Sequence, residues 1–186
     1  MAMLRVAFAA LLLALLPVQG TVLAAQDDPR LNDLFAALAK APSAEMAAPI
    51  EAEIGSIWTQ SKSATTELLL ARGAAMLESG DVDVAYKLMQ TVTALDPDFA
   101  EGWNMLANVQ LMREQTSAAI AAVKRTLELE PRHYPALAAL GNILESLGDD
   151  KAALAAYDAS LKINPTQEDV KQQAKTLRRK IEGDRI

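Results

Sequence analysis

Apolar residues recur at helical spacing along most of the chain, and between residues 66 and 167 the pattern returns every 34 residues. The residues that keep this spacing are prolines, alanines and other small residues: Pro97, Pro131 and Pro165; Ala85, Ala119 and Ala153; Gly73, Ala107 and Gly141. A fixed period of this length is typical of stacked supersecondary units. We therefore divide the stretch into units 66–99, 100–133 and 134–167 and number the positions of each from 1 to 34.

Each unit carries two amphipathic helical patterns. Positions 4, 7, 8 and 11 form the i, i+3, i+4, i+7 stripe that buries one face of a first helix. Position 8 is always Gly or Ala, and position 20, in the second helix, is always Ala. Small residues at facing positions let two helices approach closely. In the last unit this predicts that Gly141 faces Ala153, with Tyr157 at position 24 filling the space beside them.

The ends of these helices are also marked. Gly80-Asp81 and Gly148-Asp149 fall between the two patterns of their units. Gly can end a helix in the left-handed conformation, and Asp can cap the helix that follows. A proline at position 32 disfavours helical geometry for the residue before it, which closes the second helix. The repeated stretch is therefore predicted to fold as three antiparallel helix pairs.

The units resemble the tetratricopeptide repeat, whose pattern is W-x2-L-G-x2-Y, then A-x3-F, then P. The matching residues are Leu69, Gly73, Met76, Gly80, Ala85, Met89 and Pro97 in the first unit, Trp103, Leu106, Ala107, Ala119, Val123 and Pro131 in the second, and Leu137, Leu140, Gly141, Leu144, Gly148, Ala153, Tyr157 and Pro165 in the third. Arg72, Gln110 and Glu114 depart from the pattern, the last in place of the turn glycine. The resemblance implies an all-α fold, an α-solenoid of antiparallel helix pairs that forms a tetratricopeptide-like superhelix.

Residues 1–24 differ from the rest. Arg5 precedes an apolar run of 11 residues, 6–16, and small residues follow near Ala24. The run is shorter than the roughly 20 residues that a membrane-spanning helix needs. This is the pattern of a signal peptide cleaved after Ala24 or Ala25, with an uncleaved membrane anchor as the alternative. It predicts a bacterial protein that is periplasmic or secreted, and the chain has no Cys for lipid modification.

Both flanks of the repeats are predicted to be helical. Residues 25–65 hold two apolar stripes separated by Ala41-Pro42-Ser43, which we interpret as a degenerate N-terminal helix pair that caps the first repeat. Residues 168–186 carry a narrow apolar stripe among lysines and arginines. They are predicted to form a C-terminal capping helix that solvates the last repeat.

Composition excludes several classes of function. Lys and Arg total 18 against 24 Asp and Glu, a net charge of −6, with no basic tract before the last helix. This argues against nucleic acid as a partner. The absence of Cys removes disulfides, thiol nucleophiles and thiolate metal sites. After residue 24 no apolar run is long enough to span a bilayer, so no stable membrane insertion is expected once the signal is cleaved.

The chain offers little for catalysis. His133 is the only histidine and falls in the turn between two units, where we expect a surface residue. The acids at Asp81 and Asp149 are explained as helix caps. No phosphate loop, serine elbow or dinucleotide fingerprint occurs. We therefore expect no enzyme activity, no cofactor and no metal site. An enzyme or small-ligand binder built on His133 and neighbouring acids is the least favoured alternative.

The resemblance implies that the first helices line a concave groove, with positions 2, 5, 9, 12 and 13 facing it. The candidate binding residues at positions 5 to 13 are Leu70, Ala74, Leu77, Glu78, Asn104, Asn108, Leu111, Met112, Asn142 and Glu145. Asn side chains both donate and accept hydrogen bonds, so they can bind a peptide backbone. Positions 5 and 9 hold no Lys or Arg, and Glu67 and Glu101 occupy position 2. A neutral or basic segment is therefore favoured over an acidic one.

We expect a non-enzymatic scaffold or adaptor of the bacterial cell envelope that binds a protein or peptide in this groove. The alternative is a structural or oligomerising subunit of an envelope assembly, which would use its convex face. The sequence leaves the oligomeric state open.

Overall fold

The protein is α-helical over the residues that its computed structural model describes, 25–183, and no strand occurs in that range. The elements are a 3-10 turn η1 (Ala25–Asp27) and the helices α1 (Arg30–Leu38), α2 (Ala44–Trp58), α3 (Ala64–Glu78), α4 (Val82–Leu95), α5 (Ala100–Met112), α6 (Thr116–Leu129), α7 (Tyr134–Ser146), α8 (Asp150–Ile163) and α9 (Glu168–Gly183). The predicted signal segment, residues 1–24, lies outside the described residues.

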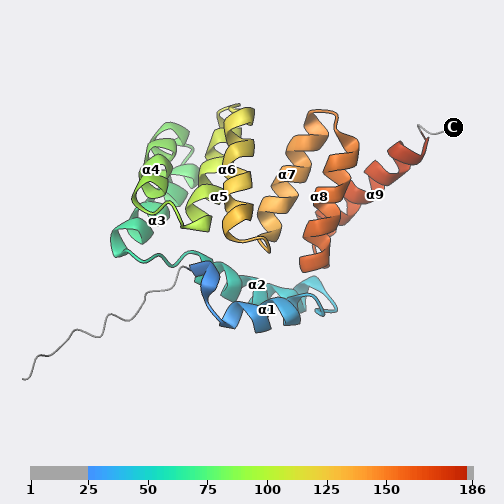
Figure 1. The fold of residues 1–186 in the computed structure, drawn as a ribbon, viewed down its shortest axis with the longest axis horizontal. Coiled ribbons are helices and arrows are strands. Elements are labelled where there is room, and N and C mark those ends of the chain that lie inside the picture. The colour runs from blue at the N-terminus through green and yellow to red at the C-terminus, as the bar shows by residue number, and fades with distance from the viewer. Residues whose placement is uncertain (1–24, 184–186) are drawn as a thin grey trace, which may run out of the picture.

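Three antiparallel pairs, α3–α4, α5–α6 and α7–α8, stack side by side in one array (Figure 1). Each pair buries one stripe between its own two helices and a second stripe against the next pair. One apolar cluster joins α3 and α4 to Leu106 and Val109 of α5, and another joins α5 and α6 to Ala136 and Ile143 of α7. The predicted all-α solenoid is therefore confirmed. Helix α9 closes the array, with Val170, Ala174 and Leu177 packed on α8.

The turns inside the pairs have the predicted geometry. Gly80 and Gly148 adopt positive φ angles of 82° and 80°. Asp81 accepts a hydrogen bond from the Val84 amide at 3.2 Å, as expected of a residue at the start of a helix. The middle unit makes the same turn without glycine, because Glu114 itself takes a φ of 60°.

Close packing within a pair depends on the small residue at position 8. A Cβ atom on Gly141 would lie 2.4 Å from the ring of Tyr157, and one on Gly73 would lie 2.2 Å from Cε of Met89. The small residue thus makes room for the large side chain at position 24. The predicted place of Tyr157 beside Gly141 is therefore confirmed. Ala153 is fully buried, and its facing of Gly141 stays a prediction.

The N-terminal pair is not placed as a cap on the first repeat. Helices α1 and α2 lie along the edge of the array where second helices end and first helices begin (Figure 1). Leu31, Phe35 and Trp58 form a cluster with Tyr134 of α7, and Ile163 of α8 packs against it. The predicted placement ahead of α3 is therefore wrong, since the apolar stripes of this pair are covered by the turns of the later repeats.

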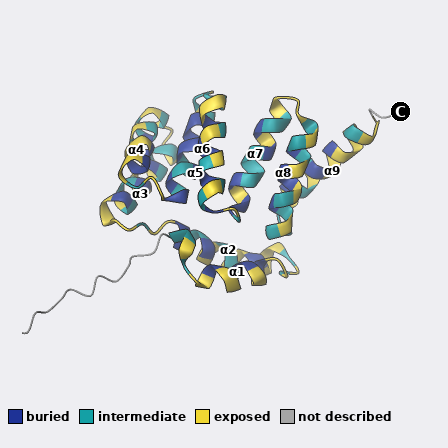
Figure 2. Ribbon diagram, in the orientation of Figure 1, coloured by how far each residue is buried: buried dark blue, intermediate teal, exposed yellow. Residues whose placement is uncertain are grey.

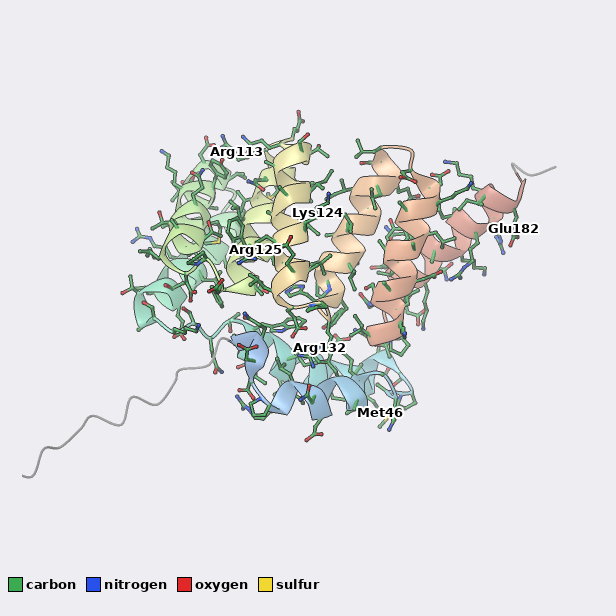
Figure 3. The ribbon with its side chains drawn as sticks, viewed as in Figure 1. Met46, Arg113, Lys124, Arg125, Arg132 and Glu182 are labelled. Carbon is green, nitrogen blue, oxygen red and sulfur yellow. The ribbon has the colours of Figure 1, made fainter. Side chains whose placement is uncertain are left out.

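Polar contacts fix the same edge. Arg132, in the turn before α7, donates through Nη1 to Oδ1 of Asn32 at 2.8 Å, and its guanidinium lies 4.5 Å from the ring centroid of Phe35. Figure 3 shows Arg132 between the repeat turn and α1. Further along the edge, Asn164 donates to Glu51 of α2 at 2.6 Å. These contacts join the N-terminal pair to the second and third repeats.

Candidate binding groove

A cleft of about 450 Å³ opens between the C-terminal end of α2 and the first helices α3 and α5. Its lining residues are Ser56, Thr59, Gln60, Glu67, Leu70, Ala71, Ala74, Glu101 and Met105. The floor is mainly apolar, while two carboxylates and the polar end of α2 form the rest of its wall. A cleft with an apolar floor and a few placed polar groups can accept a segment that carries an apolar side chain.

The repeat geometry brings these residues together. Glu67 and Glu101 occupy position 2 of adjacent units, and Ala71 and Met105 occupy position 6. Positions 2, 6 and 9 succeed one another at a spacing of one turn, so they lie on one face of a first helix. Because α3 and α5 are neighbours, the faces of the two helices form a single surface.

Both carboxylates at the cleft are held by hydrogen bonds. Oε1 of Glu67 accepts from the backbone amide of Ser61 at 2.8 Å. Glu101 accepts from Nδ2 of Asn104 at 3.0 Å and lies 3.0 Å from Nε2 of His133. Hydrogen bonds from these donors fix the direction of the carboxylates. The cleft has no Lys or Arg in its lining, so its wall is acidic.

His133 is not a surface residue, which corrects the prediction. Its side chain is 1% exposed and stacks on the indole of Trp58. Nδ1 accepts a hydrogen bond from the Ala136 amide at 3.2 Å, which leaves Nε2 to donate to Glu101. The ring is buried because α2 covers the turn that carries it. Trp58 is itself buried.

The three asparagines expected along the groove are not equally available. Asn104 is only 7% exposed, and its amide is used by Glu101 one turn earlier. Asn108 is half-buried. Asn142 is exposed, although its Oδ1 lies 2.7 Å from the Tyr157 hydroxyl oxygen and accepts from Gln173 at 3.0 Å. The candidate groove residue Asn104 is therefore largely enclosed, because α5 is packed on both sides.

The other expected residues divide between the cleft and the rest of the groove. Leu70 and Ala74 line the cleft, with Leu70 buried in its floor. Leu77, Glu78, Leu111 and Met112 lie farther along α3 and α5 and are not in its lining. Glu145 of α7 is also outside it and accepts from the Tyr157 hydroxyl at 2.7 Å. A role for these residues in binding stays a prediction.

Sequence reasoning missed five lining residues: Ser56, Thr59, Gln60, Ala71 and Met105. Ser56 belongs to α2 and the next two follow its C-terminal end, and no repeat pattern specifies the position of this segment along the edge. The other two occupy position 6, which lies next to the expected position 5. The pairing of a small Ala71 with a long Met105 was the available signal.

A second cleft, of about 490 Å³, lies on the other side of the N-terminal pair, between α1, the α6–α7 turn and α8. Phe35, Leu137 and Ile163 give it apolar walls, and Arg132 and Lys162 are its charged residues. Arg132 is already bonded to Glu130 through two nitrogens. None of the expected groove residues lines this cleft.

Among residues 25–183 no group of three or more His, Cys, Asp or Glu side chains is arranged to hold a metal ion. In the same range no helix is long and apolar enough to cross a membrane.

Burial, assisted by Glu145, raises the pKa of Tyr157, and burial with nearby Glu51 raises that of Tyr134 to about 12. Both phenols are therefore neutral hydrogen-bonding groups at ordinary pH.

Residues 105–168 match the family model described as Tetratricopeptide repeat. A TPR repeat-containing protein of Rhizobium etli is 31% identical over 156 residues, which cover 84% of this chain and 76% of that protein.

Solved structures share the fold. The first TPR of Spaghetti (RPAP3), bound to an HSP90 peptide, has a TM-score of 0.60 at 15% identity and covers 62% of this chain and 92% of its own. The Yersinia enterocolitica type III secretion chaperone SycD, in complex with a peptide of the translocator YopD, has a TM-score of 0.59 at 16% identity, covering 64% and 96%. With three stacked helix pairs, repeat turns at the predicted positions and a relative aligned along most of its length, this chain belongs to the tetratricopeptide repeat family.

Proposed function

We propose that this protein is a non-enzymatic scaffold or adaptor that binds a protein or peptide segment in the cleft between α2, α3 and α5. The observation that carries the proposal is the cleft itself, with an apolar floor at Leu70, Ala74 and Met105 beside the carboxylates of Glu67 and Glu101. The two solved structures described above, each of which holds a bound peptide, support a segment of another protein as the ligand.

The chemistry of the wall favours a neutral or basic segment. A peptide that places an apolar side chain on the floor and a Lys or Arg near Glu67 gains both burial and charge complementarity. An acidic segment meets two carboxylates and no cation in the cleft lining. The volume of about 450 Å³ holds a few side chains and not a folded domain.

The proposal that the protein is not an enzyme has support from the same geometry. His133, the only histidine of the sequence, is enclosed by Trp58, Glu101 and the amide of Ala136, and it lines neither of the two clefts described above. A substrate would have to displace α2 to reach the ring. The small-ligand alternative that relied on this residue loses its principal group.

We place the protein in the bacterial cell envelope on the basis of residues 1–24, whose charge and apolar run suit an export signal. Mass spectrometry of the native protein tests this. A chain that begins at Ala25 or Gln26 in a soluble envelope fraction supports export. An intact Met1 with tight membrane association would replace the signal by an anchor.

The binding test starts with affinity capture of the native protein from an envelope extract, followed by titration of the retained partner. Ala74→Arg fills the cleft from α3 without touching a fully buried side chain and should weaken binding at least about tenfold, or ~1.4 kcal/mol. Ala121→Arg is the matched control, because Ala121 is an exposed alanine on the second helix α6. Unchanged affinity for Ala74→Arg with a loss for Ala121→Arg would move binding to the convex face and favour the assembly-subunit alternative.

A further inference from the structure

The first helix of each unit packs on the preceding unit through positions 3, 7 and 10. In α5 these are Gly102, Leu106 and Val109, and all three are buried. A Cβ atom on Gly102 would lie 2.7 Å from Val92 of α4. The equivalent residues are Ala136, Leu140 and Ile143 in α7 and Val170, Ala174 and Leu177 in α9. This stripe is therefore the contact that propagates the solenoid.

In the first unit the same three positions are Leu68, Arg72 and Ala75, and all are exposed. Leu68 is 68% exposed, although position 3 elsewhere in the array is buried. Within residues 25–183 no element covers the end of the array at α3 and α4, because α1 and α2 lie along its edge (Figure 1). Figure 2 shows exposed residues on both helices at this end.

Helix α4 extends the open surface. Position 26 faces the preceding unit, as Arg125 of α6 shows by donating to Asp98 in the turn before α5 at 3.1 Å. In α4 this position is Thr91, which is exposed, and Leu95 one turn later is 57% exposed. We call Leu68, Arg72, Ala75, Thr91 and Leu95 the end face.

We propose that the end face binds the end face of a second copy of this chain, in a closed twofold dimer. An axis parallel to the helices places α3 of each copy on α4 of the other, in the antiparallel sense already used inside every pair. Leu68 and Leu95 lie near the same end of their helices, so Leu68 of one copy faces Leu95 of the second copy. The contact continues the repeat-stacking interface and supplies each exposed α3 stripe with a second helix.

Charge selects this arrangement over a head-to-tail stack. A head-to-tail stack would bring Arg72 against α9, whose exposed side carries Lys175 and Arg179. Like charges at a contact disfavour it. In the twofold arrangement α3 does not meet its own copy, so the two Arg72 side chains stay apart. Within residues 25–183 Arg72 has no ion pair or hydrogen bond, and its donors suit the Thr91 hydroxyl of the second copy.

The size of the face sets the strength of the dimer. Helix α3 has 15 residues, which corresponds to about 22 Å in length, and two adjacent helices are roughly 20 Å wide. The end face therefore offers roughly half of the ~800 Å² per partner that a stable interface buries. We expect a dimer that dissociates on dilution.

Sedimentation equilibrium of the protein purified from cells tests the proposal. From about 10 μM to 1 mM the weight-average mass should rise from one chain toward two and stop there. Leu68→Glu and Leu95→Glu should each weaken association at least about tenfold. Leu147→Glu is the matched control, because Leu147 is 60% exposed at the far turn between α7 and α8 and should leave the dimer intact.

A charge-swapped pair of variants separates a specific contact from a general loss of stability. The double variant Leu68→Glu/Leu95→Glu and the double variant Leu68→Lys/Leu95→Lys should each stay monomeric alone. When the two are mixed, they should associate one to one. A single-chain mass at 1 mM, a species larger than two chains, or a dimer unaffected by Leu68→Glu would each overturn the proposal.

Discussion

The imidazole of His133 is stacked on the indole of Trp58, with ring centroids 4.2 Å apart and an interplanar angle of 14°. Trp58 is the last residue of α2, and His133 caps α7 with its side chain. The stack therefore joins the N-terminal pair to the third repeat. Through the bond from His133 to Glu101 it also orients a carboxylate of the candidate cleft.

Removal of the indole should release the N-terminal pair. Trp58→Ala deletes a buried aromatic that contacts Phe35, His133 and Tyr134, at an expected cost of about 3–5 kcal/mol. Hydrogen exchange should show protection lost first in α1 and α2. Met46→Ala, at an exposed site in the same helix, should change little. Uniform loss of protection across all repeats would contradict the edge placement of the pair.

Two glycine substitutions should have opposite signs. Gly141→Ala puts a methyl group against the ring of Tyr157 and should destabilise the protein by about 1–3 kcal/mol. Gly55→Ala meets no atom within 4 Å and should stabilise α2 by up to about 1 kcal/mol, since Ala is the better helix former. Chemical denaturation measures both. Equal stability of Gly141→Ala and the parent would refute the close packing of positions 8 and 24.

The turn between α5 and α6 should be improved by glycine. Glu114 is exposed and holds a φ of 60°, which is unfavourable for any residue with a Cβ atom. Glu114→Gly should stabilise the protein by about 0.5–1 kcal/mol. The reciprocal change, Gly148→Ala, meets no crowding and should cost a similar amount through backbone strain alone. Thermal melts of both variants provide the measurement.

Stability should decline at alkaline pH. The pKa of Tyr134 is raised to about 12 and that of Tyr157 is raised above its ordinary value, both first by burial. Because the folded-state pKa lies above the unfolded value of about 10, each protonated phenol makes its full contribution to the free energy of unfolding below pH ~10. This contribution is lost as the pH rises through the folded-state pKa. Denaturation midpoints should therefore fall above pH ~10.

Tyr157→Phe isolates the part of this decline due to one phenol. The variant loses the hydrogen bond to Glu145 and the contact of the hydroxyl with Asn142, and it should be less stable at neutral pH. Its further loss of stability between neutral and alkaline pH should be smaller than that of the parent. An equally steep decline in both proteins would show that Tyr157 does not titrate with unfolding.

Much of the repeat architecture follows from local sequence. Gly80 and Gly148 take left-handed turns because no other residue does so without strain, and Asp81 caps because its carboxylate reaches the next helix's amides. The 34-residue period predicted the three pairs, and the apolar stripe within residues 168–186 predicted the helical α9. These are short-range relations, so a pattern along the chain is sufficient to predict them.

Only the tertiary structure decided which surfaces of the repeats the N-terminal pair covers and which stay exposed. The apolar stripes of α1 and α2 specify that the pair must be buried, and nothing in them says whether Trp58 meets α3 or the turn at His133. Because the pair packs on the turn at His133, this histidine is buried, and residues at and after the C-terminal end of α2 line one cleft. The same placement leaves Leu68 exposed at the end of the array. These long-range contacts depend on which surfaces fit best in three dimensions. Because hydrophobic burial is non-directional, an apolar stripe does not specify which distant surface covers it.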